Sequence, residues 1–229
     1  THIFNPSAFT LGLFSLVLII TGTTDITWGA QIASTLSLAP GIYTYLFIGG
    51  LVVMYFFSIT LVAASAAIVL FALSALYFSV TGVPYFLDSE IPTAVFLGLH
   101  LLVTDPSTSP RTPTGKLFFG VLYGVGVFVL YTILDMFGTP TFYDKLLCVP
   151  LLNLSVQWID RMVLPLRSNE TLERLGLGVT PSRRANLGHM AVWIVFFASM
   201  TLMGKTDSRH VGDSLPFWAQ ACEEGRVHA

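Results

Sequence analysis

Residues 42–81 decide the fold class, and they read IYTYLFIGGLVVMYFFSITLVAASAAIVLFALSALYFSVT, without a single charged side chain. A helix needs about 20 apolar residues to cross the roughly 30 Å hydrocarbon layer of a membrane, so this run is too long for one crossing. Ser58 to Thr60, near its middle, is the least apolar point. The stretch therefore predicts two transmembrane helices joined by a tight turn that neighbouring helices bury.

The rest of the chain has the same character. Only 10% of the 229 residues are charged and 54% are hydrophobic, whereas a soluble domain has about 25% charged residues. Ile91 to Val103 is apolar but too short to cross, which predicts a broken half-helix. Further spans are expected at Phe9 to Gly22, Leu117 to Gly138, Phe142 to Leu164 and Leu187 to Met203. The sequence thus predicts an all-α integral membrane protein of about six transmembrane helices, including the half-helix.

The positive charges predict which side of the membrane each loop faces. Segment 23–40 is polar and largely uncharged, and Gly82 to Glu90 is an acidic loop that contains Asp88. Most of the cationic residues fall in or beside two segments, namely Arg111, Lys116, Arg161, Arg167, Arg174, Arg183 and Arg184. Because cytoplasmic loops are enriched in Lys and Arg, loops 104–116 and 165–186 are expected to be cytoplasmic, in the inner (cytoplasmic) membrane of the cell. The net charge of −2 and the lack of a basic tract argue against nucleic acid as a partner, and the lipid bilayer is the expected one.

Segment 104–116, TDPSTSPRTPTGK, is the most polar stretch that lies between two spans. Its three prolines stop a helix, and the freed backbone groups must find partners in protein, water or a ligand. We interpret it as a binding loop in which Asp105 and the hydroxyl groups bond a polar ligand, while Arg111 and Lys116 meet a phosphate. An ordinary turn with helix caps is an equally weighted interpretation from the residues alone.

Asn153, Gln157 and Asp160 recur at helical spacing and share one face of the span that contains them, with Arg161 beside them. Polar residues at membrane depth usually face the interior of a bundle. We therefore expect a network between helices, completed by Asp105 or Arg111 from the loop on the same side. Asn5, at the inward end of the first span, is also expected to meet this loop.

Three ordered motifs then identify a family. HIFNPSA at residues 2–8, TDPSTSP at 104–110 and TGKLFFG at 114–120 resemble the membrane family that contains the D subunit of the Rnf electron-transport complex and the B subunit of the sodium-pumping NADH:quinone oxidoreductase. Asn153, Ile159 and Asp160 match a further family helix, with Val156 where a proline usually stands. The resemblance covers roughly residues 92–165 closely and is thin elsewhere.

The resemblance implies a flavoprotein subunit, part of a larger helical bundle, that works with other subunits in a membrane redox complex. In that family FMN is attached to the Thr of an S-G-A-T motif. The nearest segment here is Asp25 to Gln31, in which Gln31 occupies the acceptor position. A Gln side chain has no hydroxyl group to esterify, so we expect a divergent branch without covalent FMN, with a flavin or quinone bound noncovalently instead. The candidate ligand residues are Asn5, His100, Thr104, Asp105, Ser107, Ser109, Arg111, Thr114, Lys116, Asn153 and Asp160.

Two other functions stay open at this point. The chain could be a redox-silent scaffold or transport-type subunit, in which the small residues Gly120 and Gly124 serve helix packing. A less favoured alternative is a haem b protein with His100 and His189 as axial ligands. No combination of nucleophile, base and orienting residue emerges, so catalysis by this chain alone is not expected.

The sequence also predicts a division near residue 205. Residues 1–205 form the transmembrane domain, whose N-terminal part is expected to be missing because the chain begins Thr-His-Ile-Phe. Residues 206–229 read as a polar tail on the outer side. Its A-C-x-x-G pattern at Ala221 to Gly225 is typical of a Sel1-like helical repeat, which would bind other proteins.

Overall fold

The computed structural model describes residues 3–36, 38–87, 89–163, 165, 170–178, 182–206 and 210–226. Asp88, Arg167 and Arg209 lie outside these ranges. Within them the chain consists of helices and loops: α1 (Pro6–Thr21), η1 (Thr24–Ile26), α2 (Gly29–Leu36), α3 (Ile42–Phe57), α4 (Thr60–Thr81), α5 (Thr93–Leu101), α6 (Pro113–Met136), η2 (Thr141–Tyr143), α7 (Asp144–Val163), α8 (Glu170–Arg174), α9 (Arg183–Leu202), η4 (Val211–Asp213) and α10 (Leu215–Glu223).

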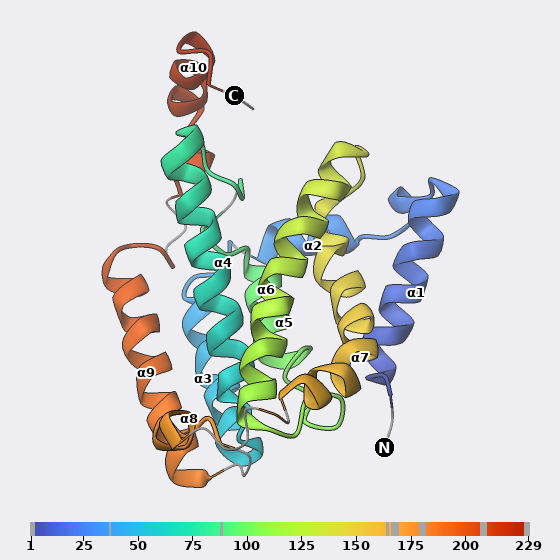
Figure 1. Ribbon diagram of the computed structural model, residues 1–229. Helices are drawn as coiled ribbons and strands as arrows, with labels where there is room; N and C mark the ends of the chain where they lie inside the picture. Colours follow the sequence, from blue (N-terminus) through green and yellow to red (C-terminus); the bar gives the residue numbers. More distant parts are fainter. Residues whose placement is uncertain are drawn as a thin grey trace.

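Among the described residues, six apolar helices of 16 or more residues run side by side: α1, α3, α4, α6, α7 and α9 (Figure 1). Successive helices of this set alternate in direction except α4 and α6, which run the same way because the short α5 returns the chain to the inner end between them. Of the segments that carry these helices, Thr60–Thr81, Pro113–Met136, Thr141–Val163 and Arg183–Leu202 are long and apolar enough to cross a membrane. α1 and α3 have 16 residues each, about 24 Å at 1.5 Å per residue, slightly short of the roughly 30 Å hydrocarbon layer. The fold is the predicted multi-pass membrane bundle.

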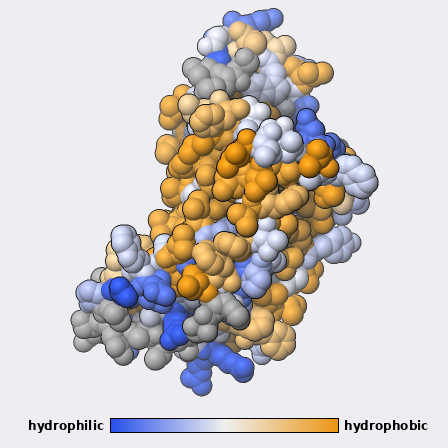
Figure 2. Space-filling model, turned by 90° about the vertical axis from the view of Figure 1, so that its right-hand side faces the viewer, coloured by the Kyte–Doolittle hydropathy of each residue, from blue (hydrophilic) through white to orange (hydrophobic). Residues whose placement is uncertain are grey.

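On the face shown in Figure 2, apolar residues cover the middle of the bundle and hydrophilic residues gather at its two ends. On α7, for example, Leu151, Leu154, Trp158 and Met162 are each at least 59% exposed. A row of large apolar side chains this exposed is unfavourable in water and is satisfied by lipid or by a partner's transmembrane helices. Helix α8 and the loop after α5 lie at the same end as the N-terminus, which we call the inner end; the opposite end is the outer end (Figure 1).

The predicted half-helix and tight turn are both present. α5 has only nine residues, and it starts at the outer end and stops inside the bundle. α3 ends at Phe57 and α4 begins at Thr60, with Ser58 in the left-handed region at φ 51°. Two side chains from other helices donate to carbonyl oxygens at this corner: Lys116 Nζ to Ser58 O at 2.8 Å, and Asn186 Nδ2 to Met54 O at 3.0 Å.

The centre of the bundle is the contact between α4 and α6, where glycines permit close approach. A Cβ atom on Gly120 would lie 2.1 Å from Ser65 Oγ and 2.2 Å from Val62 O, and one on Gly124 would lie 2.9 Å from Ala66 O. No side chain fits at these distances. The small residues therefore act in helix packing, as the sequence indicated.

Segment 23–40 was expected to be a loop, and this expectation is wrong for its second half, which forms α2. Its apolar residues at helical spacing, such as Ile32 and Leu36, are too few to stand out beside true spans. The expected loop 104–116 also ends sooner than anticipated, because α6 begins at Pro113. Proline is well tolerated at the first position of a helix, and Thr112 Oγ1 caps it by accepting the Gly115 N–H at 3.0 Å.

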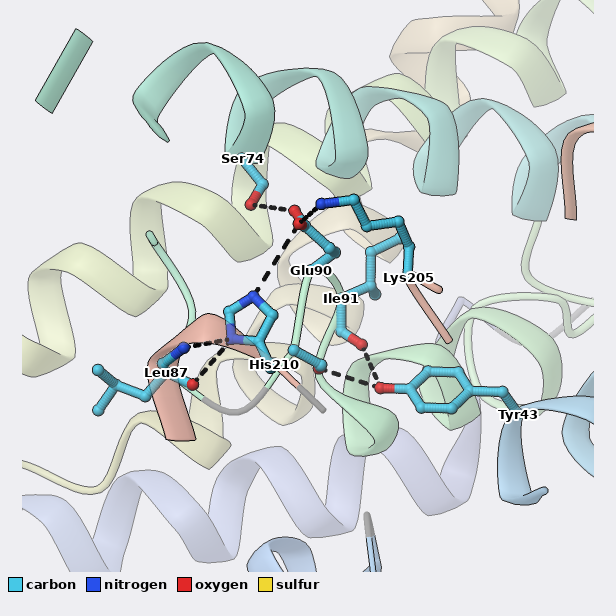
Figure 3. Close-up of polar contacts among 9 residues, drawn as sticks. Tyr43, Ser74, Leu87, Glu90, Ile91, Lys205 and His210 are labelled. Atoms are coloured by element: carbon cyan, nitrogen blue, oxygen red, sulfur yellow. Dashed lines mark hydrogen bonds and ion pairs between the residues drawn. The ribbon is translucent and has the colours of Figure 1, made fainter. Parts of the chain in front are cut away.

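The tail beyond α9 packs against the outer loop 82–92 instead of extending freely from the bundle. Glu90 is the centre of this contact: its carboxylate accepts hydrogen bonds from Lys205 Nζ at 2.5 Å and Ser74 Oγ at 3.4 Å, and His210 Nε2 lies 4.0 Å away (Figure 3). Arg226 Nη1 donates to Gly82 O at 2.9 Å. The tail thus braces the loop that leads into α5. Its relation to a Sel1-like repeat stays a prediction.

Candidate functional site

A cavity of about 450 Å³ lies at the inner end of the bundle, between the loop 102–112 and the last turns of α7. We call it the inner cavity. Residues 153, 157 and 160 share one face of α7 because of their helical spacing, and the proline-containing loop lies opposite that face. The lining consists of Ile3, Ser107, Thr108, Ser109, Arg111, Thr112, Asn153, Val156, Gln157, Asp160 and Arg161.

Local hydrogen bonds fix the shape of the loop. Where α5 stops, Thr104 Oγ1 donates to His100 O at 2.6 Å and so satisfies a carbonyl oxygen that the helix leaves free. Asp105 Oδ1 then accepts the backbone N–H of Ser107 at 2.9 Å and its hydroxyl at 2.8 Å, which is an Asx turn. The loop is therefore a defined bend that carries residues 107–112 to the cavity.

Four buried polar atoms around the inner cavity find no hydrogen-bond partner in the part of the chain that the structure describes. They are Ser109 Oγ, Asn153 Nδ2, Asn153 Oδ1 and Asp160 Oδ1. Asn153 is 3% exposed and Ser109 is 6% exposed. A buried polar group without a partner costs about 1–3 kcal/mol, and native proteins rarely leave several together. Such a group of atoms on one cavity points to a polar ligand.

The charges at the cavity are mixed. Asp160 Oδ2 accepts the Arg111 backbone N–H at 3.4 Å, a long contact that leaves most of the carboxylate's bonding capacity unused. Arg111 and Arg161 are exposed and line the mouth. The cavity therefore offers one carboxylate and one amide in its buried part, and two guanidinium groups where it opens.

Five of the predicted site residues come together at the inner cavity: Ser107, Ser109, Arg111, Asn153 and Asp160. The expected contact of Asn5 with this loop stays a prediction, although Ile3, two residues earlier, lines the same cavity as the loop. The helical spacing of Asn153 and Asp160 and the hydroxyl-rich sequence of the loop were sufficient to predict these five residues. Nothing in the sequence distinguishes Ile3 from any other apolar residue.

The other six predicted residues are not among the described lining of the cavity: Asn5, His100, Thr104, Asp105, Thr114 and Lys116. Asn5 Oδ1 caps α1 by accepting the N–H groups of Ser7 and Ala8. Thr114 Oγ1 donates to Leu177 O, and Lys116 Nζ donates to Ser58 O. For these residues the alternative interpretation, helix caps and packing, describes the observed contacts better than a ligand role.

His100 and His189 occupy different environments. The His100 imidazole is fully buried, is bonded through Nδ1 to Phe96 O at 2.8 Å and packs against Trp193 with ring centroids 5.9 Å apart. A Cβ on Gly50 would lie 2.0 Å from its Cδ2 atom. His189 Nε2 instead lies 3.2 Å from Leu175 O, near the inner surface. These contacts give the bis-His haem alternative no support.

The fold and the cavity together define a multi-pass membrane protein with a polar cavity at the inner end of its bundle. Residues 6–168 match the model of the family described as NQR2, RnfD, RnfE. This match spans most of the chain, and the protein belongs to that family. No curated protein and no solved structure matches the chain. The family places the chain among the membrane subunits of Rnf- and Nqr-type electron-transport complexes.

Proposed function

We propose that the chain binds a flavin noncovalently in the inner cavity and serves as an electron-carrying membrane subunit of a larger complex. The observation that supports this is the set of unpartnered atoms at the cavity: the Asn153 amide, Asp160 Oδ1 and Ser109 Oγ. The volume of about 450 Å³ falls within the range of roughly 300–1,000 Å³ typical of ligand sites. Val156 supplies an apolar wall against which a ring can lie.

The donor and acceptor pattern favours a flavin over a quinone. The unpartnered set contains two acceptors, Asn153 Oδ1 and Asp160 Oδ1, one donor group, Asn153 Nδ2, and one hydroxyl that serves either way. A quinone ring offers only carbonyl acceptors and would leave both protein acceptors unmatched. The pyrimidine edge of a flavin alternates carbonyl acceptors with an N–H donor. Its N–H donor can pair with one of the two protein acceptors, and a flanking carbonyl oxygen can accept a hydrogen bond from Asn153 Nδ2.

The two arginines suit the polar side of the same ligand. Arg111 and Arg161 line the cavity where it opens, and guanidinium groups bind phosphate by paired, charge-assisted hydrogen bonds. A flavin whose ring lies against Asn153 would extend its phosphate-bearing chain toward them. Gln31, the position that corresponds to the family's flavin attachment, is exposed on α2, which lies toward the outer end and not at the inner cavity. Attachment at that position is therefore not part of this proposal.

Partner subunits and orientation belong to the same proposal. An electron carrier in a membrane needs a donor and an acceptor, and the exposed apolar rows on α7 give other membrane subunits a surface for packing. We place the inner end at the cytoplasmic face of the inner membrane, because the cationic segments lie there.

Analysis of the purified protein tests the proposal. The full chain is extracted in mild detergent and denatured, and the released flavin and quinone are quantified by chromatography against protein concentration. Stoichiometric flavin is expected from the wild type, and Asp160→Asn should lose most of it. Ser155→Ala is the control and should keep its flavin, because the Ser155 hydroxyl bonds Leu152 O within α7. Stoichiometric quinone would show that the ligand is misassigned. Neither molecule, even in the assembled complex, would favour the redox-silent scaffold.

A further inference from the structure

A second cavity, of about 250 Å³, lies at the outer end of the bundle and shares no described lining residue with the inner one. We call it the outer cavity. α2 contributes Ala30 to its wall, α5 contributes Thr93 and Ala94 at its start, and the beginning of α7 contributes Asp144 and Lys145. Leu87 closes another side, and its carbonyl oxygen lies 3.1 Å from His210 Nδ1 (Figure 3). The braced outer loop therefore holds one wall of this cavity in place.

This is also the place where the family's flavin-attachment position falls, and a flavin does not fit it. Ala30 lines the cavity, and the following residue, Gln31, has no hydroxyl group that could form an ester. Ser34, one turn later, uses its hydroxyl to bond Gln31 O at 3.0 Å. The volume of about 250 Å³ is below the roughly 300 Å³ at which sites for cofactor-sized ligands begin. A smaller ligand is required.

The start of α5 supplies hydrogen-bond donors to this cavity. Thr93 is 2% exposed, and its Oγ1 finds no hydrogen-bond partner in the described chain. The preceding residue, Pro92, has no side chain that can cap the helix, and the first backbone bond of α5 is donated by Phe96. The N–H groups of the first turn, including Ala94 at the cavity wall, thus have no partner within the helix. Helix N-termini with free N–H groups and partial positive charge attract anions.

The wall formed by the start of α7 carries an ion pair. Asp144 Oδ1 accepts the Lys145 side-chain ammonium at 3.0 Å and the Lys145 backbone N–H at 2.5 Å, and the two side chains are 1% and 8% exposed. The charges of the pair cancel, so Asp144 does not repel an anion as an isolated carboxylate would. The field in the cavity is then set by the α5 N-terminus and the Thr93 hydroxyl.

We propose that the outer cavity is a site for a small carboxylate-class anion, held at the N-terminus of α5 with Thr93 donating its hydroxyl hydrogen bond. Transporter sites use the same chemistry, because the N-termini of half-helices bind the anionic groups of substrates. This site is independent of the flavin site at the inner end. It lies at the outer end of the bundle, where α2, the start of α5 and the start of α7 meet.

Acetate and acetamide form the test pair, because they share size and shape but differ in charge. The full chain in detergent is titrated with each compound at constant ionic strength, and thermal unfolding is followed. A ligand of the folded state stabilises it by RT ln(1 + [L]/Kd), which gives a concentration-dependent rise of the unfolding temperature. We expect acetate to produce this rise and acetamide to produce none.

Variants assign the effect to the cavity. Thr93→Val, which keeps the shape but removes the hydroxyl, should weaken acetate binding at least about tenfold, the equivalent of one lost hydrogen bond to a charged group. Thr139→Val is the control: the Thr139 hydroxyl bonds Leu134 O outside the cavity, so this variant should respond to acetate like wild type. Ala33→Leu, which fills the cavity from α2, should abolish the response and serves if Thr93→Val does not fold. Equal responses to acetate and acetamide, or an unchanged response in both cavity variants, would overturn the proposal, whatever the flavin content of the protein.

Discussion

Replacing Asn153 with Leu separates a ligand-binding amide from a structural one. In the structure both amide atoms of Asn153 are buried and unpartnered, whereas those of Asn186 bond Met54 O and Thr60 Oγ1. A structural amide stabilises the protein without ligand, but an amide that awaits a ligand destabilises it. Asn153→Leu removes the unpartnered atoms and leaves an apolar side chain of similar size beside Val156.

The size of the effect follows from the desolvation cost of such groups. An unpartnered buried polar group costs about 1–3 kcal/mol, so the flavin-free Asn153→Leu protein should be as stable as wild type or more stable by roughly that amount. Its flavin affinity should fall, because two hydrogen bonds at about 0.5–1.5 kcal/mol each are lost. That total of about 1–3 kcal/mol corresponds to roughly 5- to 140-fold weaker binding.

Two measurements on one preparation decide this prediction. The unfolding temperature of the flavin-free protein is measured in detergent, and flavin is then titrated back and followed by the quenching of its fluorescence. Ser155→Ala on the same helix is the matched control, and both of its values should stay near wild type. A lower unfolding temperature together with unchanged flavin affinity in Asn153→Leu would refute the reasoning.

Three further outcomes follow from the packing. Gly120→Ala should destabilise the bundle by about 1–3 kcal/mol, because the new Cβ meets the backbone of α4. Gly49→Ala should be tolerated, because no atom lies within 4 Å of the new Cβ. The unfolding temperatures of the two proteins are compared. Lys116→Met should cost about 1–3 kcal/mol, because the Ser58 carbonyl oxygen at the turn after α3 loses its side-chain donor. Flavin affinity should stay unchanged, and reduced affinity at wild-type stability would instead restore the phosphate role expected from the sequence. Lys205→Met should weaken the packing of the tail by at most about 1 kcal/mol, since the Lys205 side chain in this ion pair is 34% exposed. Faster proteolysis after α9 with an intact bundle is the expected result. An unchanged cleavage rate would show that the contact with Glu90 does not hold the tail.

The membrane fold was predictable from the sequence because its signals are long and repetitive. The uninterrupted apolar run at 42–81 and its weakest point at Ser58 gave two helices and the turn between them, and the length of 91–103 gave the half-helix. α2 was missed because its eight residues carry a pattern that any amphipathic surface segment shares. Helix ends were displaced where a proline began a helix instead of ending one, as at Pro113.

The site was predictable only where residues shared a periodic pattern or one short loop. Asn153 and Asp160 could be grouped by helical spacing, and Ser107 to Arg111 by sequence proximity. Spacing could not show that Thr114 and Lys116, in the same polar stretch, bond the carbonyl oxygens of Leu177 and Ser58, because those partners come from distant helices. The contact of Lys205 with Glu90 joins residues 115 positions apart and left no local signal.

A density map of the purified protein in its assembled complex tests the central claim most directly. We expect a planar flavin ring in the inner cavity, with its pyrimidine edge within hydrogen-bond distance of the Asn153 amide and Asp160 Oδ1. A cavity filled by a lipid chain or by protein, with the Asn153 amide bonded to neighbouring residues, would contradict the claim.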